Sequence, residues 1–345
     1  MNSDLKNFIL NQPDVDDESV VFTVRLRLAR NFRKYPFPHQ MGEKQAEQLV
    51  EHVIDAIKNF SQDTPLILHM KDTDKIIRQV LVERHIISPE FAEDSFGKTL
   101  IWLVQSGLRI LVNEEDHLRI SAFGKKNEIE KLWQILNDFD DNLSQYINYA
   151  FDREFGYLTS CPTNVGPGLR VSSLVFLPSL KLTGRIKVIF NTVYKLGCII
   201  RGFYGEGSAS IANFYQISTG PALGKKETEI CGEFDAVLSA TEKQELSAME
   251  RVRTSSIKEL IKKFFDRIYD SNEGISSDDA IKGISILIFG KNLGIIKVDR
   301  CTLKKMIYRI LPGSIQFEMG RLLQEKERDI LRLQILRKEL VGLYV

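Results

Sequence analysis

The spacing of the apolar residues changes about two thirds of the way along the chain, and this change limits the folds that the chain can adopt. From Val20 to about Leu238, short β-like apolar runs bounded by Gly, Pro, Asn and Ser alternate with amphipathic stretches. Such a mixture is typical of an α/β or α+β unit. After about Thr241, apolar residues recur every three or four positions among many charges, which is the period of an amphipathic helix. We therefore predict a larger mixed domain at 1–240 and a small all-helical domain at 241–345.

The helical part carries local signals for its own helices. Asp299 is a residue type that caps helix N-termini, and Pro312 followed by glycine is a stop signal. Residues 325–340 combine charged residues with apolar periodicity. We expect one helix to begin after Asp299 and a last helix to occupy 325–340.

Length and composition argue against several classes of protein. With 345 residues, 43% of them hydrophobic, the chain can bury two cores. A net charge of +1 gives no general reason to expect nucleic acid or an anionic membrane as a partner. No segment reaches the roughly 18 apolar residues of a membrane span, and the N-terminus lacks a signal-peptide pattern, so we expect a cytoplasmic protein. The four cysteines form no CxxC pair, which argues against a zinc site or a disulfide scaffold.

The first chemical motif is an alternation of arginine with apolar residues in Thr23–Arg30. On a strand, Arg25 and Arg27 project from the same face, about 7 Å apart. Two guanidinium groups so placed suit the oxygens of a polyphosphate, because each can make charge-assisted, often bidentate, hydrogen bonds. The alternative is a solvated strand face with ordinary ion pairs.

The second motif places three consecutive acids, Glu114, Glu115 and Asp116, before His117 and Arg119. Adjacent carboxylates repel one another unless a cation lies among them, and a guanidinium substrate would be such a cation. The alternative is an acidic surface turn with Arg119 as its local counter-ion. We expect His117 to be a structural hydrogen-bonding residue rather than a base.

The third motif is the turn-rich segment 160–170, which contains Cys161 and Asn164 and ends in Arg170. Its Pro and Gly residues allow the backbone to approach a ligand closely, and a cysteine near a cation can be a thiolate. The alternative is a plain turn with a buried, inert cysteine. Two glycine-rich stretches, 201–209 and 220–226, match neither GxGxxG nor a Walker A sequence, so we expect no P-loop.

Together these segments resemble the ATP:guanidino phosphotransferase (phosphagen kinase) superfamily, and in particular its bacterial protein arginine kinase branch. The resemblance covers nearly the whole chain, through TVRLRLARN, NEEDHLR, YLTSCPTNVGPGLR, RGFYGEGS and the C-terminal ERDILR. It implies an α+β fold: a catalytic domain built on a curved antiparallel sheet flanked by helices, followed by a small C-terminal all-α domain.

The resemblance also implies roles for individual residues. ATP would be the phosphoryl donor, with Mg²⁺ held mainly by phosphates and water, so no metal ligands are expected from the protein. Glu115 would hold the acceptor guanidinium and act as its base, with Glu114 and Cys161 beside it. The nucleotide would be bound by Arg25, Arg27, Arg119, Arg170, Thr23 and Asn164.

Two features favour a protein substrate over free arginine. In small-molecule members of the superfamily an additional helical domain precedes the arginine motif, whereas here the motif begins at Thr23, so we expect an open acceptor site. The segment with Arg328, Asp329 and Arg332 resembles the RDxxRA phosphoarginine pocket of the branch, with Leu333 in place of the alanine. The alternative for this segment is an ordinary charged helix face.

One departure keeps other functions open. The resemblance implies a second clamp glutamate just after GEGS, where this chain has Ala209, and Glu206 belongs to another position of the motif. Tyr204 stands where free-arginine kinases have another phosphate-binding arginine, a change shared with the bacterial branch. The first alternative is therefore a weakly active or inactive phosphoarginine-binding adaptor, and the second is a free-arginine kinase. The resemblance further implies protein substrates with accessible arginines, a zinc-binding activator protein, a Clp-type protease that receives marked proteins, and homo-oligomers.

Overall fold

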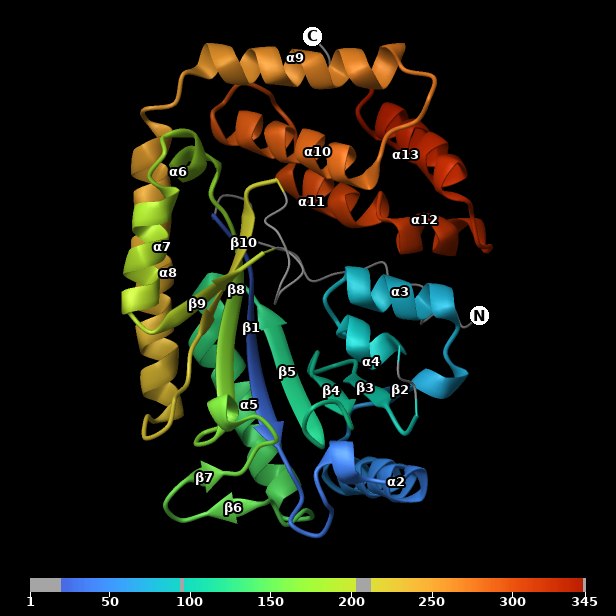
Figure 1. Cartoon of the computed structure of the whole chain (residues 1–345), viewed down its shortest axis with the longest axis vertical. Helices are drawn as coiled ribbons and strands as arrows, with labels where there is room; N and C mark the ends of the chain where they lie inside the picture. The colour runs from blue at the N-terminus through green and yellow to red at the C-terminus, as the bar shows by residue number, and fades with distance from the viewer. Residues whose placement is uncertain (1–19, 94–95, 203–211, 344–345) are drawn as a thin grey trace.

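The computed structural model describes residues 20–93, 96–202 and 212–343. An eight-stranded sheet, strand order β2-β3-β4-β5-β1-β8-β10-β9, runs through its larger part (Figure 1). Every neighbouring pair of strands is antiparallel. The strands are β1 (Val21–Arg30), β2 (Pro65–His69), β3 (Thr99–Leu103), β4 (Arg109–Val112), β5 (Leu118–Gly124), β8 (Leu169–Phe176), β9 (Cys198–Arg201) and β10 (Phe214–Thr219), while β6 (Phe151–Asp152) and β7 (Gly156–Tyr157) form a separate hairpin.

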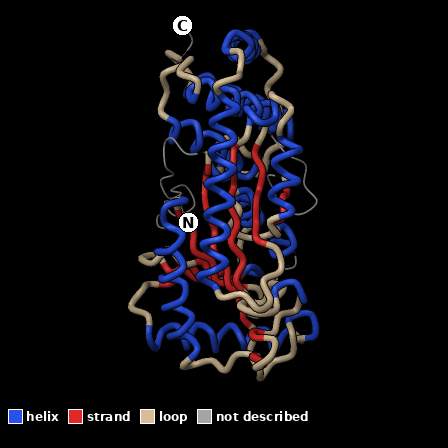
Figure 2. Tube along the Cα trace, turned by 90° about the vertical axis from the view of Figure 1, so that its left-hand side faces the viewer, coloured by secondary structure: helices blue, strands red, loops and turns tan. Residues whose placement is uncertain are grey.

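Strand β1 lies inside the sheet because one of its faces is apolar. Val24, Leu26 and Leu28 are fully buried, whereas the alternating arginines Arg25 and Arg27 are half-buried on the other face. This alternation confirms the prediction that the two arginines share a face. The apolar face packs against amphipathic helices in the first core, which covers one side of the strands (Figure 2). These helices are α2 (Glu43–Phe60), α5 (Ile129–Ser144) and α8 (Glu227–Met249).

Shorter helices complete the larger part. They are α3 (Lys75–Glu83), α4 (Pro89–Glu93), α6 (Pro178–Leu182) and α7 (Ile186–Lys195), with single 3₁₀ turns at Pro38–Gln40, Met70–Asp72, Lys126–Glu128 and Pro162–Asn164. The antiparallel sheet with flanking helices that the resemblance implies is thus confirmed.

The C-terminal part is helical, as expected. Asp299 caps α11, because its carboxylate accepts hydrogen bonds from the backbone N–H groups of Cys301 and Thr302. The helices are α9 (Thr254–Asp270), α10 (Ser277–Asn292), α11 (Arg300–Arg309), α12 (Pro312–Met319) and α13 (Glu325–Glu339). The apolar faces of α9, α10, α11 and α13 form a second core that also includes Phe22, Leu174, Phe176 and Phe214 of the sheet. Helix α12 instead packs Phe317 against Val80 of α3.

The two parts are joined without a break. Helix α8 runs through position 240 to Met249, and Ala248 near its end still belongs to the first core. The predicted division at 240–241 therefore falls inside a helix. None of the helices in the described ranges has both the length and the apolar character needed to cross a bilayer.

Candidate active site

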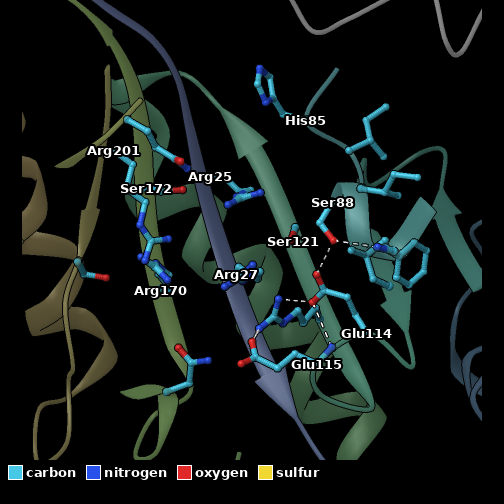
Figure 3. Close-up of a pocket in the computed structure, with 18 of the residues that line it drawn as sticks. Arg25, Arg27, His85, Ser88, Glu114, Glu115, Ser121, Arg170, Ser172 and Arg201 are labelled. Atoms are coloured by element: carbon cyan, nitrogen blue, oxygen red, sulfur yellow. Dashed lines mark hydrogen bonds and ion pairs between the residues drawn. The ribbon is translucent and has the colours of Figure 1, made fainter. Parts of the chain in front are cut away.

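A cavity of about 1190 Å³ lies on the arginine-bearing face of the sheet (Figure 3). Its volume exceeds that of a typical ligand pocket, so it has room for a nucleotide together with part of a second substrate. Strands β1, β5 and β8, the segment 85–91 and the loop after β7 all contribute to its lining. It brings together every residue predicted for catalysis and nucleotide binding: Thr23, Arg25, Arg27, Glu114, Glu115, Arg119, Cys161, Asn164 and Arg170.

Four arginines converge on this cavity from three adjacent strands, and we call them the arginine row: Arg25, Arg27, Arg119 and Arg170. The strand register places Arg27 of β1 opposite Arg170 of β8. Burial, reinforced by the charges of Arg27, Arg170 and Arg119, lowers the pKa of Arg25 to about 9. Like charges held this close disfavour one another, so the row favours a bound polyanion.

Arg119 also links the row to the acidic residues. Its Nη1 pairs with Glu114, and its Nη2 donates to Glu115. Burial lowers the pKa of Arg119 to about 10, with Arg27 adding to the shift and Glu114 opposing it. The side chain of Glu115 is 43% exposed, whereas that of Glu114 is 11% exposed. Arg119 is thus the counter-ion that the alternative interpretation expected, and Glu115 is the more exposed of the two glutamates.

Asp116 fastens the acidic turn, residues 113–117, to the cysteine loop, residues 158–168. It is fully buried, and its Oδ1 accepts hydrogen bonds from Asn31 Nδ2 at 2.7 Å and from the Ser160 backbone N–H at 2.8 Å. Asn31 Nδ2 also donates to the carbonyl of Leu158 at 3.0 Å. Asn31, the residue after β1, therefore helps to hold the acidic turn and the cysteine loop next to each other.

His117 is a structural residue, as predicted. Its Nδ1 accepts a hydrogen bond from the Phe32 N–H at 2.9 Å, and its Nε2 lies 2.7 Å from the carbonyl oxygen of Pro36, to which it can only donate. These partners require the neutral imidazole. Burial lowers the pKa of His117 to about 4, so the ring is uncharged near neutral pH.

Cys161 is only half-buried and lines the cavity, unlike the buried, inert cysteine of the alternative interpretation. Its Sγ lies 3.0 Å from Thr163 Oγ1, within the short turn that follows it. The hydrogen bond from Ser160 to Asp116 joins the residue before Cys161 to the acidic turn.

Sequence reasoning missed other lining residues. His85, two residues after the end of α3, adopts a left-handed backbone (φ 56°), and burial lowers the pKa of its ring to about 4. Ser88 Oγ donates to Glu114 Oε1 at 3.1 Å (Figure 3). Arg201 ends β9 and begins the glycine-rich motif, which was the only signal for it. Ser121 and Ser172 have no local signal at all. The expectations for Tyr204, Glu206 and Ala209 concern positions outside the described residues.

The structure places Arg328, Asp329 and Arg332 on α13, apart from the cavity. Arg332 is buried and donates to the carbonyls of Ile310 at 2.7 Å and Ile275 at 2.6 Å, besides pairing with Asp329. It is therefore not part of a solvated helix face. Its guanidinium braces the loops before α10 and α12, and the predicted phosphoarginine role remains a prediction.

The arginine row can hold ATP phosphates, whereas a protein-built metal centre has no counterpart in the described ranges. Within those ranges, no group of three or more His, Cys, Asp or Glu side chains is placed to bind a metal ion. The arginine row instead presents guanidinium groups to the cavity, and these suit phosphate oxygens.

The fold and this site define a phosphotransferase that acts on guanidino groups, and family comparisons agree. The model for the ATP:guanido phosphotransferase C-terminal catalytic domain matches residues 45–248, and that for the protein-arginine kinase McsB C-terminal domain matches residues 262–343. The chain belongs to the ATP:guanido phosphotransferase family, in its protein-arginine kinase branch. The branch recognised from the sequence is thereby confirmed.

Curated relatives match over nearly the whole chain. The protein-arginine kinase of Halothermothrix orenii is 33% identical over 344 residues, covering 99% of this chain and 98% of that protein. The protein-arginine kinase of Bacillus cereus (strain AH187) is 36% identical over 335 residues, covering 95% and 94%.

Solved structures support the fold. A lombricine kinase crystal structure aligns with a TM-score of 0.59 and 20% identity, covering 71% of this chain and 72% of that one. The duplicated taurocyamine kinase of Schistosoma mansoni with bound transition-state-analogue components aligns with a TM-score of 0.60 and 22% identity, covering 74% and 39%.

Proposed function

We propose that this kinase transfers the γ-phosphoryl group of ATP to the guanidinium of arginine side chains in proteins. The observation that carries the proposal is the meeting of the arginine row with the exposed carboxylate of Glu115 in one cavity. One set of residues suits a polyphosphate and the other suits a guanidinium. The names of the relatives, protein-arginine kinases, support the protein-borne acceptor.

The arginine row would bind and align the phosphates. Phosphoryl transfer needs little covalent help, because its transition state is stabilised mainly by alignment and by positive charge around the transferring group. Magnesium, when bound with ATP, supplies further charge to the phosphate oxygens, and mostly phosphates and water would hold it. Thr23 and Asn164 line the same cavity and would complete the nucleotide contacts.

Glu115 would orient the acceptor and take its proton. An arginine side chain has a pKa above about 12 and is a poor nucleophile until it is deprotonated. In the structure Glu115 pairs with Arg119, which belongs to the row. Phosphates drawn to Arg119 would compete with Glu115 for that guanidinium, so nucleotide binding would release the carboxylate to the acceptor. Cys161 and Glu114 would flank the acceptor.

We further propose that phosphorylated proteins are marked for a Clp-type protease, with a zinc-binding activator protein and homo-oligomers as regulatory partners. These proposals rest on what the family resemblance implies, and the cytoplasmic location expected from the sequence is likewise a proposal. No described contact favours the adaptor or the free-arginine kinase over the protein kinase.

The test compares the wild-type chain with Glu115→Ala. Purified protein is incubated with γ-labelled ATP, magnesium and an arginine-rich protein, and the product is examined for acid-labile, base-stable phosphate. Loss of the base and clamp should lower the rate by at least about a hundredfold. Glu130→Ala, an exposed glutamate on α5 away from the cavity, is the matched control and should keep full activity.

Other outcomes would change the conclusion. Faster labelling of free arginine than of the protein would make the chain a free-arginine kinase. Absence of transfer even with an activator, alongside retained phosphoarginine binding, would make it an adaptor.

A further inference from the structure

Helix α12 of the C-terminal part is capped by a carboxylate from the larger part. Glu83, the last residue of α3, accepts hydrogen bonds from the backbone N–H groups of Gly313 at 2.6 Å and Ser314 at 3.2 Å. These N–H groups belong to the first turn of α12, where they have no partner within the helix. Glu83 is 93% buried, since only 7% of its surface is exposed. A residue 230 positions away in sequence thus completes the start of this helix.

The contact is extended and close-packed. Gln79 of α3 donates to Glu83 Oε1 at 3.2 Å and accepts from Gln316 of α12 at 3.2 Å. A Cβ at Gly313 would lie 2.9 Å from Glu83 Oε2 and 3.0 Å from Gln79 Cγ. Helices α3 and α12 lie next to each other in Figure 1. A side chain at position 313 would therefore require Glu83 or Gln79 to move.

The chain passes from Glu83 directly into the cavity. The residues that follow, 85–91, all line the cavity, and we call them the cavity wall. His85 turns the backbone into the wall through its left-handed conformation. Ser88 in the wall holds Glu114, which pairs with Arg119 of the arginine row. Hydrogen bonds and ion pairs, together with the short chain segment between Glu83 and Ser88, therefore link α12 to the arginine row.

We propose that Glu83 is a positioning residue: by capping α12 it makes the C-terminal helices set the position of the cavity wall, and thereby the affinity for ATP. The proposal rests on the proposed function only in that the cavity binds ATP. The C-terminal helices would thus influence nucleotide binding indirectly, because none of their residues lines the described cavity.

A second buried carboxylate caps a helix elsewhere in the chain. Glu245 of α8 accepts hydrogen bonds from the N–H groups of Ser179 at 2.7 Å and Leu180 at 2.9 Å, which begin α6, and it is 3% exposed. Neither Glu245 nor α6 lines the cavity. Glu245→Gln therefore reproduces the loss of a buried helix cap without moving the wall.

The experiment measures ATP binding to the full-length chain by equilibrium dialysis, and the KM and kcat of phosphoryl transfer. The variants are Glu83→Gln, Gly313→Ala and the control Glu245→Gln, each checked for folding by circular dichroism. We expect Glu83→Gln and Gly313→Ala to weaken ATP binding about tenfold and to raise KM for ATP by the same factor. Glu245→Gln should lower the melting temperature but keep the wild-type Kd.

Two outcomes would overturn the proposal. One is wild-type ATP affinity in folded Glu83→Gln and Gly313→Ala. The other is equal weakening in all three variants, because that would reflect general loosening of the fold. Since ATP binding is measured directly, a failure of arginine phosphorylation would refute the proposed function without deciding this one.

Discussion

At the residue scale, the site depends on a fully buried carboxylate, that of Asp116. Asp116 is buried without a full counter-ion: its Oδ2 lies 3.7 Å from Arg119 Nε, and neither of these two atoms has a hydrogen bond. Burial raises the pKa of this carboxyl. A costly group of this kind is retained where its other oxygen does something that no apolar residue can do, which here is to join the acidic turn to the cysteine loop.

We expect Asp116→Ala to impair acceptor use. The change leaves the Ser160 N–H and the Asn31 amide without their acceptor, at a cost of about 1–3 kcal/mol in the free energy of unfolding. The change also releases the cysteine loop from the acidic turn that contains Glu115. We therefore expect kcat/KM for the protein acceptor to fall about a hundredfold. Asp116→Asn keeps an acceptor oxygen and should fall less than about tenfold. Equal losses in steady-state assays of the two variants would contradict this role.

At the element scale, helix packing explains glycines that helix propensity disfavours. Gly283 and Gly290 lie within α10, although glycine costs a helix about 1 kcal/mol relative to alanine. A Cβ at Gly283 would lie 1.8 Å from the ring of Phe264 on α9, and one at Gly290 would lie 2.5 Å from Ile261. These two positions of α10 are therefore glycine despite its poor helix propensity, because α9 packs directly against the backbone of α10.

Gly283→Ala should therefore destabilise the protein despite better helix propensity. Overpacking of this kind costs about 1–3 kcal/mol in the free energy of unfolding. Gly232→Ala in α8 is the matched control, because a Cβ there meets nothing within 4 Å. It should stabilise by up to about 1 kcal/mol. Urea unfolding of both variants checks the pair, and a more stable Gly283→Ala would show that α9 can move aside.

At the scale of the whole molecule, buried titratable groups link stability to pH in opposite directions. The pKa of His117 is about 4 in the folded chain against its usual 6.5. Between these values the unfolded chain binds more protons, so stability is lost as pH falls from about 6.5 to 4. Burial raises the pKa of Glu83 to about 7 from 4.5. There the folded chain binds more protons, so stability is lost as pH rises through that range.

We expect His117→Asn to flatten the acid side of this profile. Asparagine can accept from the Phe32 N–H yet does not titrate. The pH dependence of the unfolding free energy between about pH 4 and 6.5 should then fall by up to roughly one proton. Part of the pH dependence should remain in this variant, because the pKa of His85 is also about 4. Denaturant unfolding at several pH values measures this, and an unchanged slope would mean that His117 is protonated in the folded chain.

The sequence by itself determined the features that follow from local geometry. Alternation in β1 placed Arg25 and Arg27 on one face because a strand repeats every two residues. Spacing of three and four residues identified the C-terminal helices, and Asp299 marked the start of α11. The resemblance to known motifs predicted one common site for the arginine row, Glu115 and Cys161, and all of these residues line the cavity.

The tertiary structure alone decided which distant groups became partners. The pairing of Glu83 with α12, the wall at 85–91 beside Glu114, and the burial of Arg332 against Ile275 and Ile310 have no local signal. Each depends on how elements far apart in the sequence pack against one another, and packing joins residues by shape and by the need to satisfy buried polar groups. Periodicity fixes the direction in which a side chain points, but only the folded chain fixes what it meets.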